Sequence, residues 1–457
     1  MQENKMGVMP VGKLILSMAW PAMIAMMIQA LYNVVDSFFV SRIGTEALAA
    51  VTYVFPFQFM MISVAVGTGV GINSLISRRL GAKRFSDADI AASHGYMLSF
   101  FSWIPFLFIG ILLADPLMRF MSNTDYVVDN GAIYLRIIMI GSIMVFIQVT
   151  TEKILQATGN MIVPMLCGIA GAITNMVLDP LMIFGLGPFP KLGVMGAAIA
   201  TIGGQIAAFA IGQYVLFARK HPVKVRLRGW KWDRGIVKDI YAVGGPAIVM
   251  QGIGSVLQFC MNMILGGFTE TAVAVMGVYG RLQSFIFMPV FGLNQGVLPI
   301  MGYNYGARNR KRFMEAFKKG FAFAFCIMAL GLILFQIFPH QLLALFNANN
   351  DAEMFEIGVP AFRAISLCFL PASFGIMSST IFQASGHGFI SLWGSLIRQL
   401  VGILPMAFLF ARYSGLDMVW FAFPLAEILG TAYFIIALKY MYKKEFKRLG
   451  IAPDEPF

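Results

Sequence analysis

Long apolar segments alternate with short polar or basic connections along the whole 457-residue chain. The apolar segments exceed the ~18 residues that mark a helix crossing a bilayer. We therefore expect an all-α integral membrane protein, and we exclude a transmembrane β-barrel because its strands would give weak, alternating segments. Twelve transmembrane helices are predicted, at residues 14–41, 47–77, 88–113, 127–156, 161–186, 193–218, 236–266, 271–303, 313–338, 353–384, 389–411 and 416–441.

The first of these segments, from Leu14 to Val40, contains a single charged residue, Asp36. A lone carboxylate inside a membrane helix costs at least ~2.5 kcal/mol on insertion scales, so it should face protein or water and is a functional candidate. Tyr32 and Asn33 lie on the same helix face as Asp36. The first helix is thus predicted to carry a polar stripe on an otherwise apolar surface.

The second half of the chain repeats the first. A shift of 225 residues pairs Pro21 with Pro246, Gly67 with Gly292 and Gly71 with Gly296, and a shift of 227 pairs Arg136 with Arg363 and Gly159 with Gly386. We predict two lobes of six helices, residues 1–225 and 226–457. Because each lobe has an even number of spans, both enter the membrane from the same side, and the pseudo-twofold axis runs along the membrane normal. This architecture is typical of transporters in which two bundles rock about a cleft.

The repeat fails at the acidic residues. Asp36 corresponds to Met261, and Asp179, the only charge of the fifth span, corresponds to Met406. Asn175 lies one turn before Asp179 on the same helix face. Packing is therefore duplicated between the lobes, whereas these acids are confined to the first lobe.

The polar groups of three first-lobe spans are expected at one depth in the membrane. At a helical rise of ~1.5 Å per residue, Asp36 and Asp179 lie about 10 Å, and Thr201 about 12 Å, from the same membrane face. Two carboxylates, with the Asn175 amide, the Thr201 hydroxyl and the Tyr32 phenol, could bind a shared proton or a small hard cation such as Na⁺. For Asn175, Thr201 and Tyr32 taken singly, hydrogen bonding between helices is the stronger interpretation. For the two acids we favour function, since asparagine could supply structural bonds at lower cost.

Other polar residues within the spans are harder to assign. Glu152 stands beside Lys153 near the inner end of the fourth span, where an interfacial ion pair is at least as good an interpretation as a role in transport. The second lobe embeds Arg281, Arg398 and Glu427, and the sequence does not say which of them pair. We interpret His94 as structural.

Composition and charge agree with a polytopic membrane protein. The chain is 58% hydrophobic and 12% charged, with a mean hydropathy of +0.76 and a net charge of +12. Lys and Arg gather in the connections of one side, which predicts that both termini are cytoplasmic. No soluble basic module exists for nucleic acid to bind. The longest basic connection, Arg219 to Lys238, is interpreted as a topology signal in preference to a binding site for anionic lipid.

The motifs together resemble one family. YNVVDSFFVSRIG in the first span, SRRLGAKR, LQATGN, TNMVLDPLMIFGLG and the second-half GYNYGARNRKR resemble the multidrug and toxic compound extrusion (MATE) transporters, in the bacterial DinF/MepA-like branch. The resemblance implies that H⁺ or Na⁺ moves inward in exchange for an organic compound. It places the first-lobe cation site on Tyr32, Asp36, Asn175, Asp179 and Thr201, and the acid of the fourth span on Glu152. Other MATE branches place an essential carboxylate on the seventh span. This span departs from them, because it offers Gln251, Gln258 and Asn262 there, and its one acid, Asp239, stands at its start.

From this we predict a secondary active multidrug efflux antiporter, not an enzyme, that exports amphipathic and often cationic compounds in exchange for H⁺ or Na⁺. Asn33 and Glu152 are additional candidates for coupling or substrate binding, and Na⁺ would bind at Asp36, Asp179 and Asn175. We expect no cofactor, membrane lipid as a partner, and a monomer in the bacterial inner membrane. Two alternatives stay open. A flippase for lipid-linked oligosaccharides would need more cations along its cleft, and a membrane-embedded enzyme would need a nucleophile, metal cluster or phosphate loop.

Overall fold

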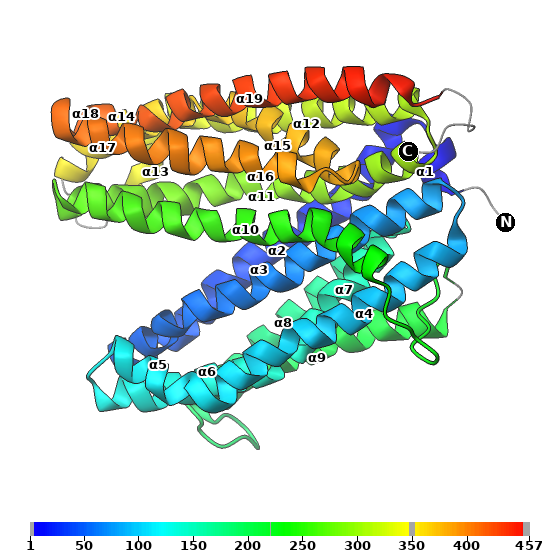
Figure 1. Ribbon diagram of the computed structural model, residues 1–457. Helices are drawn as coiled ribbons and strands as arrows, with labels where there is room; N and C mark the ends of the chain where they lie inside the picture. The colour runs from blue at the N-terminus through cyan, green and yellow to red at the C-terminus, as the bar shows by residue number, and fades with distance from the viewer. Residues whose placement is uncertain (1–3, 220, 347–351, 451–457) are drawn as a thin grey trace. The chain divides into compact units, whose positions relative to one another are not determined.

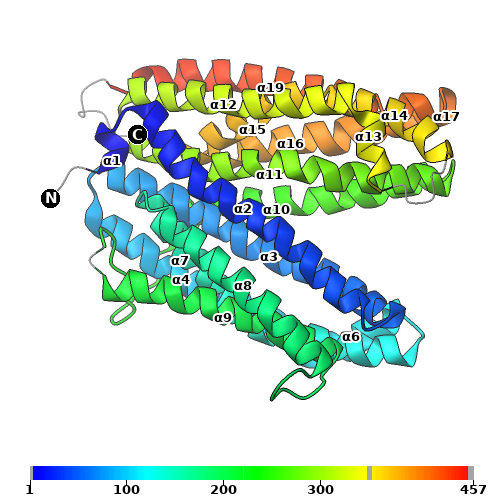
Figure 2. The same cartoon turned by 180° about the vertical axis from the view of Figure 1, so that it is seen from behind.

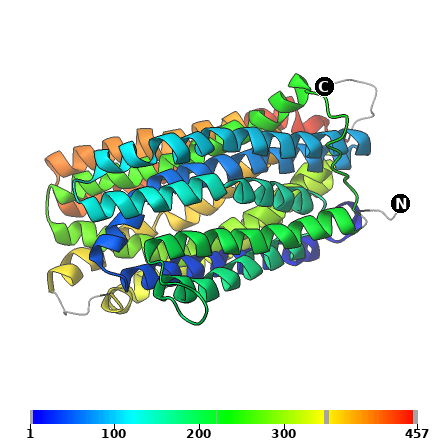
Figure 3. The same ribbon diagram turned by 90° about the horizontal axis from the view of Figure 1, so that it is seen from below.

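The computed structural model describes residues 4–219, 221–346 and 352–450, except for the side chains of Asn33, Val34 and Ser37. Every regular element in the described part of the chain is helical (Figures 1, 2 and 3). The first-half helices are α1 Lys5–Val8, α2 Val11–Ser41, α3 Thr45–Gly81, α4 Phe85–Phe108, α5 Ala114–Met121, α6 Asp125–Gly141, α7 Ile143–Ala157, α8 Ile162–Phe184 and α9 Val194–Ala218. The second-half helices are α10 Arg234–Gly266, α11 Glu270–Gly306, α12 Arg310–Ile337, α13 Pro339–Ala344, α14 Ala352–Ser366, α15 Phe369–Ala384, α16 Gly388–Leu396, α17 Leu404–Tyr413, α18 Leu416–Val419 and α19 Ala422–Lys444.

Within the described residues, ten helical segments are long and apolar enough to cross a membrane. Two bent pairs, α6 with α7 at 42° and α14 with α15 at 44°, raise the number to twelve if each pair is one span. Two other spans contain a short π-helical stretch, Ile109–Leu113 between α4 and α5 and Ile397–Ile403 between α16 and α17. Each predicted span lies on one of these segments, so the predicted all-α membrane fold is confirmed.

The helices form two compact units. The N unit comprises Ile24–Gly244, and the C unit comprises Met1–Met23 with Gly245–Phe457. The boundary predicted after residue 225 therefore does not match the compact units. The first part of α2 packs with the second half of the chain, and the first turns of α10 pack with the first half.

Glycines at positions matched by the repeat explain why the first part of α2 belongs to the C unit and the first turns of α10 belong to the N unit. In the N unit, a Cβ atom on Gly71 would lie 2.2 Å from the Ile240 carbonyl oxygen of α10, and one on Gly244 would lie 3.1 Å from the Gly67 carbonyl oxygen. The backbones of α3 and α10 therefore touch, which only small residues allow. Sequence periodicity could not have shown this contact, because both helices are apolar on several faces.

The C unit has the same arrangement at the matched positions of α11. A Cβ atom on Gly296 would lie 2.8 Å from the backbone nitrogen of Ala19, and one on Gly292 would lie 2.6 Å from the Cα atom of Met23. Each unit thus holds the first segment of the other half's first helix by direct backbone packing. The units divide close to these packed glycines and not at the long loop.

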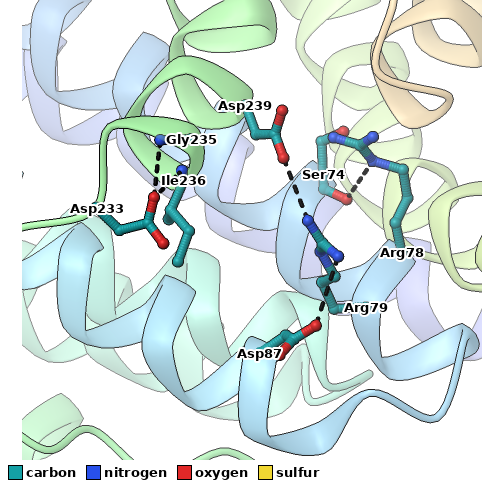
Figure 4. Close-up of polar contacts among 8 residues, drawn as sticks. All are labelled: Ser74, Arg78, Arg79, Asp87, Asp233, Gly235, Ile236 and Asp239. Atoms are coloured by element: carbon teal, nitrogen blue, oxygen red, sulfur yellow. Dashed lines mark hydrogen bonds and ion pairs between the residues drawn. The ribbon is translucent and has the colours of Figure 1, made fainter.

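Polar contacts hold the beginnings of the same two segments. In the N unit, Arg79 at the end of α3 lies between Asp239 of α10 (3.2 Å) and Asp87 of α4 (3.5 Å), as Figure 4 shows. In the C unit, the positions 225 residues later are Asn304 and Arg312. Both donate to the carbonyl oxygen of Met6, at 3.1 Å each, in the segment that precedes α2.

Gly71→Ala tests the backbone packing. The added methyl group must displace the α10 backbone, and overpacking of this kind costs about 1–3 kcal/mol. We expect a clear fall in the apparent unfolding temperature in detergent, measured by thermal-shift size-exclusion chromatography. Gly254→Ala on α10 is the matched control, since its Cβ atom would meet nothing within 4 Å. Equal unfolding temperatures for the two variants would contradict the proposed packing.

Candidate functional site

The candidate site lies inside the N unit, where α8 and α9 pack along each other. A Cβ atom on Gly204 would lie 2.6 Å from the Gly171 carbonyl oxygen and 3.1 Å from the Cβ atom of Asn175. This close approach places Asn175 and Asp179 of α8 against the α9 residues around Thr201. Glycine and alanine, common on both helices, are the residues that permit it.

Three polar side chains where α8 meets α9 are almost completely buried. Asp179 is 0% exposed, Asn175 2% and Thr201 3%. Asn175 Nδ2 donates to Asp179 Oδ1 over 3.4 Å, and Thr201 Oγ1 donates to the Ala197 carbonyl oxygen of its own helix over 3.0 Å. The Thr201 hydroxyl therefore keeps its lone pairs available as acceptors.

The second part of α2 completes the group. The carboxyl group of Asp36 lies close to that of Asp179, and the phenol of Tyr32 lies close to Thr201. The five residues predicted from the sequence, Tyr32, Asp36, Asn175, Asp179 and Thr201, thus lie together. The side chain of Asn33 is outside the described residues.

Three buried oxygen atoms of this group have no hydrogen-bond partner within the described structure. They are Asp36 Oδ1, Asn175 Oδ1 and Asp179 Oδ2. Burying an oxygen without a partner is costly, and a buried carboxylate is costlier still. A proton on one carboxyl group, or a hard cation among the three oxygens, would satisfy them. No cluster of three or more His, Cys, Asp or Glu with metal-binding geometry occurs in the described part of the chain.

Tyr134 of α6 is a member of the site that sequence reasoning missed. Its side chain is 2% exposed, and its hydroxyl lies near Thr201, Tyr32 and the two acids. Tyrosine in an apolar span gives no charge signal, and neither the repeat nor a motif marks this position. Only the packing of α6 against α9 brings it to the group.

Glu152 lies on α7, which contributes none of the site residues described above. Its Oε1 atom accepts a hydrogen bond from Gln148 Nε2 over 3.1 Å, and Lys153 Nζ donates to Gln156 Oε1 over 2.9 Å. Consecutive residues of a helix point about 100° apart. Glu152 and Lys153 therefore point in different directions, and each forms its described hydrogen bond with another residue of the same helix. The role of Glu152 stays a prediction.

The C unit has no equivalent of this acidic pair at the matched positions. The position of Asn175 is taken by Gly402, whose Cβ atom would lie 2.7 Å from the Cβ atom of Ala426 on α19, so helix packing fills the space. The embedded charges pair instead between the π-helical stretch and α19, where Arg398 Nη1 donates to Glu427 Oε1 over 3.3 Å. This answers the pairing question left open by the sequence.

The described residues hold ten to twelve candidate membrane spans, in two matched halves with a buried polar group in one of them. This arrangement is typical of a polytopic membrane transporter of the two-repeat class. The MatE family model matches residues 21–181 and 246–409, and the chain belongs to this family, the MATE transporters. The chain is accordingly an efflux transporter. This confirms the family predicted from the first span, the loops and the second-half motif.

The relatives agree over nearly their whole lengths. A protein of Shewanella oneidensis named FAD transporter is 26% identical over 434 residues, 94% of each chain. The multidrug export protein MepA of Staphylococcus aureus is 23% identical over 426 residues, 92% of each chain. A MATE crystal structure in complex with MaL6 has a TM-score of 0.90 and 29% identity, covering 97% of this chain and 100% of that one.

The crowding of carboxylates predicts an unusual effect on stability. Asp179→Asn removes one of two neighbouring charges and keeps the side-chain shape, so we expect the unfolding temperature at mildly alkaline pH to rise or stay unchanged. Asn175→Asp adds a third carboxylate of the same shape and should lower it. Thermal unfolding in detergent compares the two. A lower unfolding temperature for Asp179→Asn than for Asn175→Asp would contradict the charge argument.

Proposed function

We propose that this chain is a secondary active antiporter that exports amphipathic, often cationic, organic compounds in exchange for H⁺ or Na⁺. The coupling ion binds at Asp36 and Asp179, with Asn175, Tyr32 and Thr201 as neighbouring groups. The observation that carries the proposal is the set of buried oxygens without partners on Asp36, Asn175 and Asp179. An all-oxygen set with two carboxylates suits a proton or a small hard cation.

The coupling step follows from electrostatics. Two ionised carboxylates that lie close together repel each other in a medium of low dielectric constant. A bound proton or Na⁺ removes the repulsion and lets α2 approach α8 and α9 more closely. The helix α2 belongs to the C unit up to Met23 and to the N unit from Ile24 on. A change in its position is therefore passed to both units. Ion occupancy thereby selects the conformation from which the substrate leaves.

The membrane and its sides are part of the proposal. The connections that follow α3, α9, α11 and α19 carry the excess of Lys and Arg. By the positive-inside rule we place them on the cytoplasmic side of a bacterial inner membrane. Both termini are then cytoplasmic, and the chain works as a monomer. The relative named FAD transporter makes FAD the second substrate to test.

Transport in proteoliposomes tests the proposal. Wild-type protein should expel a cationic dye when a pH or Na⁺ gradient is imposed separately, and Asp36→Asn and Asp179→Asn should each lose at least about tenfold of the gradient-driven rate, because a neutral amide holds neither ion at this site. FAD replaces the dye in a parallel assay. Glu152→Gln is measured beside them to decide whether this acid also takes part.

Asp129→Asn is the matched control, since Asp129 is exposed on α6. It removes the same charge from the N unit and should transport like the wild type. Normal gradient-driven efflux by correctly inserted Asp36→Asn and Asp179→Asn proteins would refute the assignment of the coupling site.

A further inference from the structure

The described part of the connection between α9 and α10, from residue 221 on, is attached to α4 through its backbone. Three of its N–H groups donate to side chains on one face of α4: Lys224 to Asp89 Oδ1 (2.7 Å), Arg226 to Ser93 Oγ (2.9 Å) and Asp233 to His94 Nε2 (3.0 Å). A topology signal requires positive charge alone and no defined conformation. The ordered attachment therefore calls for a further explanation.

Aromatic side chains strengthen the attachment. His94 is 0% exposed and its Nδ1 atom faces the Ile90 carbonyl oxygen at 2.9 Å, so Nδ1 is the donor and Nε2 is free to accept from Asp233. The Trp230 ring lies against His94 with ring centroids 5.2 Å apart, and Trp232 lies edge-on to Trp230 at 5.8 Å. These contacts fix the position of Trp232, which is nevertheless 51% exposed.

The acids of this region are already engaged. Asp233 Oδ1 accepts from the backbone nitrogens of Gly235 and Ile236 at the start of α10, and Asp239 pairs with Arg79 (Figure 4). Burial lowers the pKa of His221, so this side chain adds little positive charge at neutral pH. The positive charge that this region offers to a ligand therefore comes from lysine and arginine.

Six cations are exposed between residues 224 and 238, which we call the basic segment. They are Lys224, Arg226, Arg228, Lys231, Arg234 and Lys238. None of the six forms an ion pair with any residue that the structure describes. Leu227 is 49% exposed in the midst of them. Exposed tryptophan and leucine among unpaired cations are typical of a surface that meets lipid headgroups.

The location of the basic segment agrees with such a surface. It covers most of the connection between α9, which ends at Ala218, and α10, which begins at Arg234, together with the first turn of α10 (Figure 1). Because both helices are long and apolar enough to cross a membrane, we expect the basic segment at one membrane face. It also leads directly into the part of α10 that packs on Gly71 and Gly67 of the N unit. A ligand on the basic segment would therefore act on the packing of α10.

We propose that the basic segment is a binding site for anionic phospholipids. Its guanidinium and ammonium groups bind the lipid phosphates, and Trp232 and Leu227 sit at the boundary between headgroups and acyl chains. Each basic residue near a charged membrane surface contributes about fivefold to the affinity. Lipid bound here holds the first turns of α10 against the N unit, so efflux depends on the anionic lipid content.

The test uses full-length protein in nanodiscs of phosphatidylcholine with and without brominated phosphatidylglycerol, and reads the quenching of Trp232 fluorescence by difference from Trp232→Phe. The probe variant carries Lys224→Gln, Arg226→Gln, Arg228→Gln and Lys231→Gln. The matched control carries Lys318→Gln, Lys439→Gln, Lys443→Gln and Lys447→Gln, which removes the same charge from other exposed positions.

We expect brominated phosphatidylglycerol to quench Trp232 in the wild type and the control, and the probe variant to need at least about a hundredfold more of this lipid, since four contributions of about fivefold are lost. Equal quenching of the probe and control variants would overturn the proposal. Equal quenching of the wild type by brominated phosphatidylcholine would also overturn it. Displacement of the lipid by polyglutamate would overturn it too, because it would identify an acidic polypeptide as the ligand. The readout is binding, so its failure is separate from any failure of ion coupling.

Discussion

Direct backbone packing at four glycines is the constraint on which the rest of the structure depends. Gly67 and Gly71 hold the first part of α10 in the N unit, and Gly292 and Gly296 hold the first part of α2 in the C unit. The chain passes between the units at only two points, Met23/Ile24 and Gly244/Gly245. Pro21 and Pro246 lie beside these points, and a proline removes one backbone hydrogen bond of a helix. Any relative movement of the two units must therefore be accommodated in α2 and α10.

This constraint gives the proposed ion site its place in the proposed mechanism. Asp36 stands on the part of α2 that belongs to the N unit, facing Asp179 of α8, while the preceding residues of the same helix are held by the C unit. A change in charge at Asp36 therefore acts on a helix that both units share. The site can stay in one unit only, because a single shared helix is sufficient to pass its state to the other. The C unit uses its matched positions for packing at Gly402 and Ala426.

Sequence patterns were sufficient to predict the helices, and charge and motif were sufficient to select candidate residues that lie together in the structure. Twelve apolar segments, a repeat and two isolated acids all show directly in the order of residues. Contacts between helices do not: the position of Tyr134, the pairing of Arg398 with Glu427, and the exchange of α2 and α10 between the units depend on which faces meet in three dimensions. The compact units divide at Met23/Ile24 and Gly244/Gly245, whereas the lobe boundary predicted at residue 225 follows the repeat and the long loop.

In the proposed mechanism, ion binding at Asp36 and Asp179 favours the conformation from which the substrate leaves and so weakens substrate binding. If a bound ion weakens the binding of the substrate, linkage requires that bound substrate also weakens the binding of the ion. The most direct measurement is equilibrium binding of a fluorescent cationic substrate to purified protein across pH and Na⁺ concentration. The account predicts that wild-type affinity falls as H⁺ or Na⁺ fills the site, and that the Asp36→Asn/Asp179→Asn double variant binds the substrate with an affinity independent of both ions. An unchanged ion dependence in the double variant would contradict it.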